Sequence, residues 1–167
     1  MLATLKAVQV CVDPEQLATA AEPVLIGDLH CQQSGAGEIF SFEYDHAWLR
    51  GAAAFAFDPD LALVSGPQYP SADRASFAIF LDSSPDRWWR VLMQRRENTR
   101  ARHDGRRPRS LTDWDSLLGV HDETRLGALR FRAAAGEPYI DSDARLAAPP
   151  SRRCVSCRQR ASTLRRM

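Results

Sequence analysis

The chain has 167 residues, which is enough for one domain with a buried core. Hydrophobic residues make up 44% and charged residues 26%, and these values exclude wholesale disorder and a fibrous repeat. No apolar run approaches the roughly 20 residues of a membrane span, and the first residues lack the basic and apolar regions of a secretory leader. We therefore expect no membrane contact and a cytoplasmic protein.

The charges are divided unevenly along the sequence. Residues 151–167 hold six arginines and no acidic residue, whereas residues 1–150 hold 16 basic and 21 acidic residues, a net charge of −5. Lys6 is the only lysine, and no glycine-rich loop precedes it. Because phosphate-transfer sites place a lysine on the nucleotide phosphates, the composition argues against an enzyme that uses a nucleotide by itself.

Three strands are predicted in the first third of the chain. Residues Leu5–Val12 are rich in β-branched side chains and partly alternating, and residues 24–30 have the same character. After a polar turn over residues 32–37, residues 38–44 alternate apolar and polar side chains, which is typical of a half-buried strand. Together these segments favour an antiparallel sheet.

Loops and then helices are predicted for the middle of the chain. Trp48 and Leu49 are expected to anchor the exit from the third strand, and prolines mark loops up to residue 70. Phe77, Phe80 and Leu81 have the spacing of one helix face.

A second helix has the clearest start signal in the sequence. We expect Ser84 as its N-cap, Pro85 at the first helical position, and Asp86 near the positive end of the helix dipole. The helix should end by residues 103–105. Its core-facing side chains are predicted to be Trp88, Trp89, Leu92 and Met93.

Shorter elements complete the predicted fold. Thr112 and Asp115 have capping-box spacing and introduce a short helix that ends before Gly119. Residues 127–132 alternate again and are expected to return to the sheet, and residues 139–140 add a short strand. The fold class is therefore α+β, a small antiparallel sheet packed with a few helices.

The cysteines raise the question of a zinc site or a disulfide. Cys154 and Cys157 form a CxxC pair, and Cys11 and Cys31 bring the total to four thiols. A single CxxC without a second matched pair is a weak signal, and this one lies in an arginine-rich tail rather than at a helix start beside a βαβ unit. We therefore predict no metal site, no cofactor and no catalytic thiol.

Histidines and paired carboxylates are the remaining candidates for acid–base chemistry. None of the histidines has a partner at an established ligand spacing, and we expect them to be surface or core residues: His30, His46, His103 and His121. The close acidic pairs lie where helix starts attract acids, so we interpret them as caps rather than as catalysts: Asp82 with Asp86, and Asp113 with Asp115.

Residues 95–109 form an arginine-rich stretch. They contain seven arginines and two acidic residues, Glu97 and Asp104. Such a stretch could follow nucleic-acid phosphates. A solvated helix face followed by an exposed loop explains the same pattern, since no aromatic residue is interleaved as a stacking platform.

Three blocks of the sequence carry a resemblance to a known family. They are Trp48-Leu49, then Phe77 with Leu81-Asp82-Ser83-Ser84-Pro85-Asp86-Arg87-Trp88, and finally the run from Leu117 to Phe131 with Asp122, Arg125, Gly127, Ala128 and Leu129. In order and spacing, from about Gly27 to Ile140, they resemble the N-terminal region of HipA-family toxins. The resemblance implies that the motif residues have a structural role.

The resemblance also implies a function. Full-length HipA-like proteins are serine/threonine kinase toxins of type II toxin–antitoxin systems, and their partner is a HipB-like helix-turn-helix antitoxin that binds operator DNA. Their N-terminal region is a largely non-catalytic subdomain packed on the kinase core. The nucleotide loop, its lysine and the catalytic and metal-binding aspartates would follow position 150, so we expect no catalytic residue here and only indirect contact with DNA.

Two features depart from the family pattern. Trp89 stands where the family has a glycine, which places a bulky indole on a helix expected to pack closely. Past residue 150 no apolar periodicity remains, so we expect a subdomain over residues 1–147 and a basic, disordered or frameshifted tail over residues 148–167.

Three functions follow as hypotheses. The leading one is the N-terminal portion of a HipA-like kinase toxin that is inactive alone. The second is a free-standing interaction module that binds a separate kinase chain or the antitoxin through an exposed apolar surface. The third is direct nucleic-acid binding through residues 95–109 and the tail.

Overall fold

The computed structural model describes residues 5–13, 22–34, 37–72, 74–122, 125 and 127–142. The predicted tail over residues 148–167, with Cys154 and Cys157, lies outside the described residues. Among the residues that are described, no helix is both long enough and apolar enough to cross a membrane.

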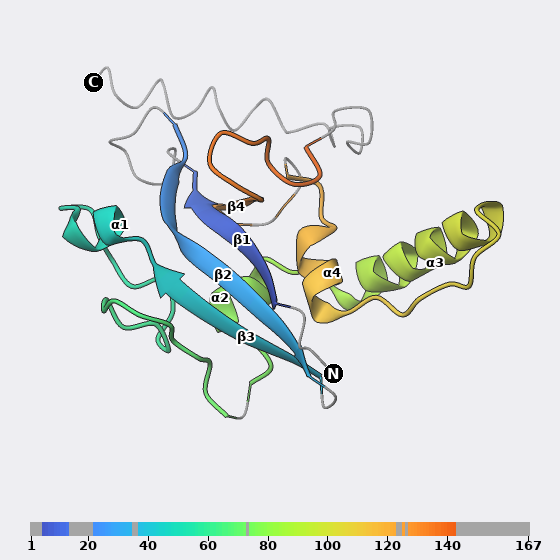
Figure 1. The fold of residues 1–167 in the computed structure, drawn as a ribbon, viewed down its shortest axis with the longest axis horizontal. Coiled ribbons are helices and arrows are strands. Elements are labelled where there is room, and N and C mark those ends of the chain that lie inside the picture. Colours follow the sequence, from blue (N-terminus) through green and yellow to red (C-terminus); the bar gives the residue numbers. More distant parts are fainter. Residues whose placement is uncertain are drawn as a thin grey trace, which may run out of the picture.

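A four-stranded antiparallel sheet forms the centre of the fold (Figure 1). Its strands are β1 (Leu5–Val12), β2 (Val24–Ser34), β3 (Gly37–Tyr44) and β4 (Leu129–Arg132), and their order across the sheet is β3-β2-β1-β4. The predicted α+β class is confirmed, and so are four of the predicted strands, while the short strand expected at residues 139–140 is only an isolated bridge between Tyr139 and Arg132. The prediction for β2 was too short, because β2 continues to Ser34 and pairs there with Gly37 instead of turning at residue 32.

Along the strands, apolar side chains recur at every second position and point to the same face of the sheet, and the core lies on that face. On β3 these are Phe40, Phe42 and Tyr44, and on β4 they are Leu129 and Phe131. All five are at most 3% exposed. The period-two pattern of the sequence therefore identifies the inner face of both edge strands.

Two short helices cover this face. Phe80 of α2 (Ala78–Asp82) has its ring 5.7 Å from that of Phe42 and 6.3 Å from that of Phe131. Trp114 of α4 (Asp113–Leu118) has its ring 6.1 Å from that of Phe40. Leu81 does not share the environment of Phe77 and Phe80, with which it was predicted to form one helix face, since both phenylalanines are buried and Leu81 is 40% exposed.

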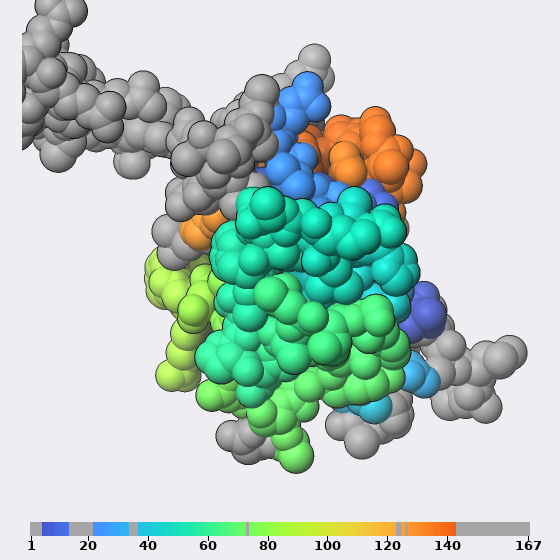
Figure 2. Space-filling view, turned by 90° about the vertical axis from the view of Figure 1, so that its left-hand side faces the viewer, coloured from blue at the N-terminus to red at the C-terminus, as the bar shows by residue number. Residues whose placement is uncertain are grey.

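A third short helix and a long connecting segment cover one side of the molecule (Figure 2). The helix α1 (His46–Arg50) begins at Asp45, whose Oδ1 accepts hydrogen bonds from the Ala47 and Trp48 backbones, and Trp48 is buried as expected. Within the segment that follows, Gln68 exchanges two backbone hydrogen bonds with Phe42 and so covers part of the free edge of β3.

The caps of α4 and α3 test the predicted helix starts. At α4 the box between Thr112 and Asp115 is confirmed. At α3 (Arg87–His103) the N-cap is Asp86, whose Oδ1 accepts from the Trp89 backbone at 2.8 Å, and the helix begins at Arg87. The prediction of Ser84 as N-cap was wrong, because the Ser84 hydroxyl instead donates to the Phe80 carbonyl at 2.8 Å.

The predicted core-facing side of α3 is also wrong. Trp88 is 64% exposed and Trp89 41% exposed, while Leu92 and Met93 are half-buried, and Ala101 is the one fully buried residue of the helix. Figure 1 shows why: α3 projects away from the sheet, and the loop after it returns along the helix to α4. The Trp89 indole therefore crowds no neighbouring helix.

Candidate functional site

The motif residues of the second and third blocks meet around one buried arginine. Arg125 is 8% exposed, and its guanidinium donates hydrogen bonds to three backbone carbonyls. The acceptors are Leu117 at 2.6 Å, Val120 at 3.0 Å and Ser83 at 3.4 Å. Because the carbonyls belong to the α2–α3 junction and to the end of α4, Arg125 ties segments together that are 34 or more residues apart in the chain.

Electrostatics and ring contacts hold the same arginine in place. Burial lowers the pKa of the Arg125 guanidinium to about 10, and the carboxylates of Asp122 and Asp141 oppose this shift. The guanidinium carbon lies 4.6 Å from the centre of the Phe131 ring, a cation–π contact. The positive charge of buried Arg125 is therefore partly balanced by the two nearby carboxylates, and its hydrogen bonds determine the position of the guanidinium.

A second ion pair anchors β4 beside this cluster. The Asp122 Oδ2 atom accepts from Nε of Arg130 at 2.9 Å and from Nη2 of the same side chain. The Arg130 guanidinium lies 3.9 Å from the centre of the Tyr139 ring, and hydrogen bonding to Asp122 raises the pKa of Arg130. These contacts connect β4 with both the segment before it and the segment after it.

The other motif residues make backbone contacts. The Pro85 carbonyl accepts from Nε of Arg90 at 3.1 Å, and the Ala128 carbonyl accepts from the Asp13 backbone at 2.8 Å. Gly127 has a φ of 90°, a conformation that favours glycine. The structure therefore brings part of the motif together at a junction of elements around Arg125 and Asp122, whereas Arg87 and Trp88 of the same motif are exposed on α3.

Several large apolar side chains are exposed at the end of α2 and on the first turns of α3. We call them together the tryptophan patch, and each is at least 40% exposed: Leu81, Trp88, Trp89 and Val91. Two neighbouring tryptophans with this exposure are unusual on a protein surface unless they contact a partner. Sequence periodicity assigned both indoles to the core and so did not find this surface.

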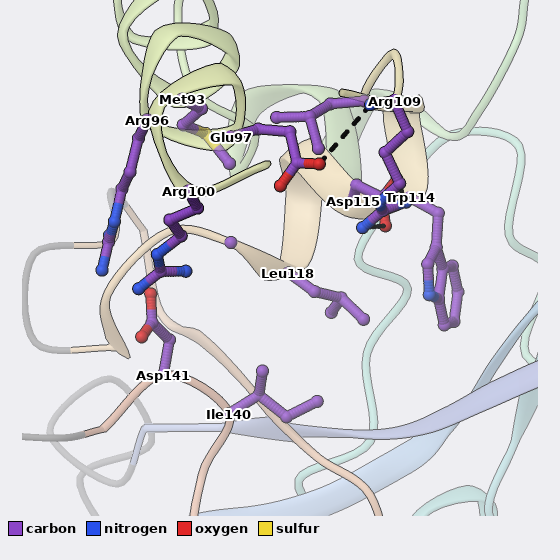
Figure 3. Close-up of a pocket in the computed structure, with 12 residues that line it drawn as sticks. Met93, Arg96, Glu97, Arg100, Arg109, Trp114, Asp115, Leu118, Ile140 and Asp141 are labelled. Carbon is purple, nitrogen blue, oxygen red and sulfur yellow. Dashed lines mark hydrogen bonds and ion pairs between the residues drawn. The ribbon is translucent and has the colours of Figure 1, made fainter. Parts of the chain in front are cut away.

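A cleft of about 440 Å³ lies between α3, α4 and residues 140–141 (Figure 3). Met93, Leu118 and Ile140 contribute apolar surface, and Arg100 and Asp141 are turned toward one another at one side. Asp141 has a φ of 57°, a left-handed backbone that aspartate tolerates better than most residues.

One ion pair ties the loop after α3 back to α3, and a second ties it to α4. Arg106 Nη1 lies 2.6 Å from Glu97 Oε1, and Arg109 Nη1 lies 2.7 Å from Asp115 Oδ2. Gln94 donates to the Arg109 carbonyl at 2.8 Å and accepts from the Leu111 backbone at 3.0 Å. The loop therefore has a defined position along α3.

The pKa of Glu97 offers a test of this loop. The hydrogen bond from Arg106 holds that pKa at about 2, below its ordinary value of 4.5. Since the folded pKa is depressed, the contact should be fully present above about pH 4.5 and lost only as the pH falls toward 2. We expect the Glu97 carboxyl carbon signal in a carbon-13 NMR titration to stay constant from pH 6 to 4. A midpoint above 4 would contradict the contact, and Glu137, which is exposed, serves as the internal control.

The residues considered for metal or acid–base chemistry are dispersed. His46 and His103 are exposed, His30 is half-buried on β2, and His121 is buried at the end of α4. Among the described residues, no group of three or more His, Cys, Asp or Glu could hold a metal ion. Of the acidic pairs, Asp86 and Asp115 cap helices, and Asp113 pairs with Arg90 at 2.6 Å.

The two described cysteines belong to the core. Cys11 and Cys31 are free and buried, on β1 and β2. Burial raises the pKa of the Cys31 thiol to about 12 and raises that of Cys11 as well. Both thiols therefore stay protonated at neutral pH and lack the thiolate that nucleophilic or metal chemistry requires.

Comparisons of the chain with models of protein families, with curated proteins and with solved structures find no match.

Proposed function

We propose that these residues form the non-catalytic N-terminal portion of a HipA-like serine/threonine kinase toxin and act by docking onto a kinase chain. The tryptophan patch is the observation that carries this proposal. Its two indoles are exposed beside a rigid cluster of motif residues, and exposed aromatic side chains at a fixed position are typical of the centre of an interface.

The position of the only lysine supports a non-catalytic role. Lys6 lies on β1, and its Nζ is 3.9 Å from Oε1 of Glu38, a residue of β3 whose other carboxylate oxygen accepts from the Trp114 backbone at 2.9 Å. This lysine is therefore held on the sheet surface beside Glu38, and the same carboxylate occupies a backbone N–H at the start of α4.

The role of the motif residues supports the same proposal. Arg125, Asp122 and Gly127 fix the α2–α3 junction against α4 and β4, and that junction presents the tryptophan patch. A preformed patch binds with less loss of conformational entropy than a flexible one.

Co-purification tests this proposal. The tagged full chain would be co-expressed with a HipA-like kinase core that lacks its own N-terminal subdomain. We expect the two chains to elute together, and the double variant Trp88→Ala/Trp89→Ala to retain less than a tenth of the kinase. Loss of two buried aromatic anchors at an interface exceeds the 1.4 kcal/mol that corresponds to a tenfold change.

Tyr69→Ala is the matched control, because Tyr69 is 61% exposed but lies in the segment between α1 and α2. It should bind the kinase core as the parent chain does. Failure of the parent chain to bind, or equal binding by the double tryptophan variant, contradicts the proposal. Capture of a helix-turn-helix antitoxin in place of the kinase core would assign the patch to the antitoxin instead.

Calorimetry with magnesium-ATP tests the non-catalytic part separately. We expect no binding heat and no autophosphorylation of the purified chain. Magnesium-dependent turnover by the chain alone would overturn this part of the proposal.

A further inference from the structure

The second half of α3 and the loop that follows it form a positively charged projection, which we call the basic arm and define as residues 95–109. The basic arm holds seven arginines and two acidic residues, a net charge of +5. Residues 1–94 hold five basic and twelve acidic residues, a net charge of −7. Among the described residues, positive charge is therefore concentrated in the basic arm, where it can orient an approaching polyanion.

Internal ion pairs use only two of these arginines. Arg106 pairs with Glu97, and Arg109 pairs with Asp115. The other five are exposed and form no ion pair with another described residue: Arg95, Arg96, Arg100, Arg102 and Arg107. The two internal pairs thus position the loop, and the remaining guanidinium groups, apart from that of Arg100, which is turned toward Asp141, are left for an external anion.

Helix geometry arranges the free arginines in two rows. Arg95 and Arg102 are seven residues apart, so they share a face about 10 Å long, and Arg96 and Arg100 are four apart on the adjoining face toward the cleft. Arg107 lies in the loop that Gln94 and Glu97 hold beside the helix. The cations therefore follow the length of this part of α3, a helix that projects from the sheet (Figure 1).

We propose that the basic arm binds the phosphodiester backbone of a nucleic acid directly. A linear array of guanidinium groups matches a linear array of phosphates, and each guanidinium can bind a phosphate through two parallel hydrogen bonds. Cation release from the nucleic acid supplies the free energy, so binding is independent of sequence and decreases with salt. This goes beyond kinase docking, which uses the tryptophan patch at the opposite end of α3.

The composition of the arm favours nucleic acid over a lipid surface. A helix that lies in a membrane interface needs a continuous apolar face along its length. From Arg95 to His103, α3 carries a single apolar side chain, Ala101, and that residue is buried. The arm therefore has charge for an anionic surface but no exposed apolar side chains to insert into it.

Fluorescence anisotropy with labelled probes tests the proposal on the full chain. The probes are a 25-base-pair DNA duplex and a 25-nucleotide single-stranded RNA of mixed sequence. Comparison of the two association constants shows which nucleic acid is preferred. With three or four phosphate contacts, the logarithm of the association constant for the duplex should fall with the logarithm of the salt concentration with a slope of about −3 to −4.

Two exposed arginines of one row are the best substitution targets. The variant Arg95→Gln/Arg102→Gln should reduce the slope by about 2 and weaken binding more than tenfold at low salt. The control Arg50→Gln/Arg74→Gln changes the net charge equally but lies outside the arm, in α1 and before α2, and should bind within about twofold of the parent chain. Because these side chains are exposed, circular dichroism should show that all variants are folded. The variant Arg96→Gln/Arg107→Gln tests the same surface a second time and should also weaken binding.

Several outcomes would overturn the proposal. The first is the absence of binding to both probes at low salt, on the order of 20 mM. The second is an equal loss of binding in the control variant. The third is an association constant that does not change with salt concentration. Equal binding to vesicles of anionic phospholipid would assign the arm to a membrane surface, and salt-sensitive self-association without nucleic-acid binding would assign it to a second copy of this chain. Loss of nucleic-acid binding with kinase capture intact would separate this result from the proposed function.

Discussion

Replacing Arg125 with alanine should lower the free energy of unfolding by about 3–5 kcal/mol, the largest effect expected of any single substitution in this chain. The change removes one guanidinium but leaves three carbonyl groups, of Leu117, Val120 and Ser83, without their donor. It also removes the contact with the Phe131 ring.

Urea denaturation followed by tryptophan fluorescence measures this effect. The midpoint should fall while the dependence on urea concentration stays constant. Arg125→Lys keeps the charge but not the planar set of donors, so it should recover less than half of the loss. Arg132→Ala is the matched control, since Arg132 on β4 makes one hydrogen bond to Gln9 and should cost about 1 kcal/mol or less. An Arg125→Ala variant within 1 kcal/mol of the parent, on the order of one ordinary hydrogen bond, would contradict the structural role.

Gly27→Ala is expected to destabilise the sheet by about 3 kcal/mol. Gly27 lies on β2 between Val10 and Tyr44, and its backbone carries no positive φ, so the substitution adds no conformational strain of its own. The cost is steric, because a Cβ atom here would collide with the Glu43 carbonyl oxygen and lie 2.6 Å from the Phe42 ring. Neither the strand backbone nor a fully buried ring can move away without breaking the pairing of β2 with β3.

Thermal and urea unfolding measure this cost, and Gly136→Ala provides the comparison. Gly136 has a φ of 80°, and a Cβ atom added there would have no neighbour within 4 Å, so its substitution reports conformational strain alone, about 1 kcal/mol. Amide signals of residues 26–28 and 42–44 should shift in the Gly27 variant and not in the control. Equal stability of the two variants would show that the steric clash at Gly27 costs no more than the strain at Gly136 and would contradict the prediction.

Much of the fold follows from local sequence signals. The boundaries of β1 and the capping box at Thr112 were predicted correctly, because a period-two pattern and a cap are properties of a few neighbouring residues. The start of α3 was misplaced by two residues, since serine, proline and aspartate all have helix-start preferences and only tertiary contacts decide among them. The Ser84 hydroxyl bonds to the preceding turn, which leaves Asp86 as the cap.

The exposure of α3 could not be predicted from its residues. Indoles are buried when a neighbouring element covers them, and the apolar pattern of a helix does not state whether such an element exists. In place of an apolar neighbour, α3 has the returning loop beside it, which Gln94 and Glu97 hold through hydrogen bonds. Asp58 was missed for a related reason: its buried carboxylate accepts from the Ile79 backbone at 2.8 Å and so caps α2 from 21 residues away.

The position of β4 has a consequence for how the protein is made. Val10 pairs with Phe131, so one edge of β1 has no partner until nearly the whole described chain has left the ribosome. During synthesis the three-stranded intermediate exposes an unpaired edge of apolar character, the kind of surface that recruits other nascent chains. Closing a contact this distant in sequence is also slow. Yields in cells should therefore respond more to chaperone supply and to growth temperature than the stability of the finished molecule would suggest.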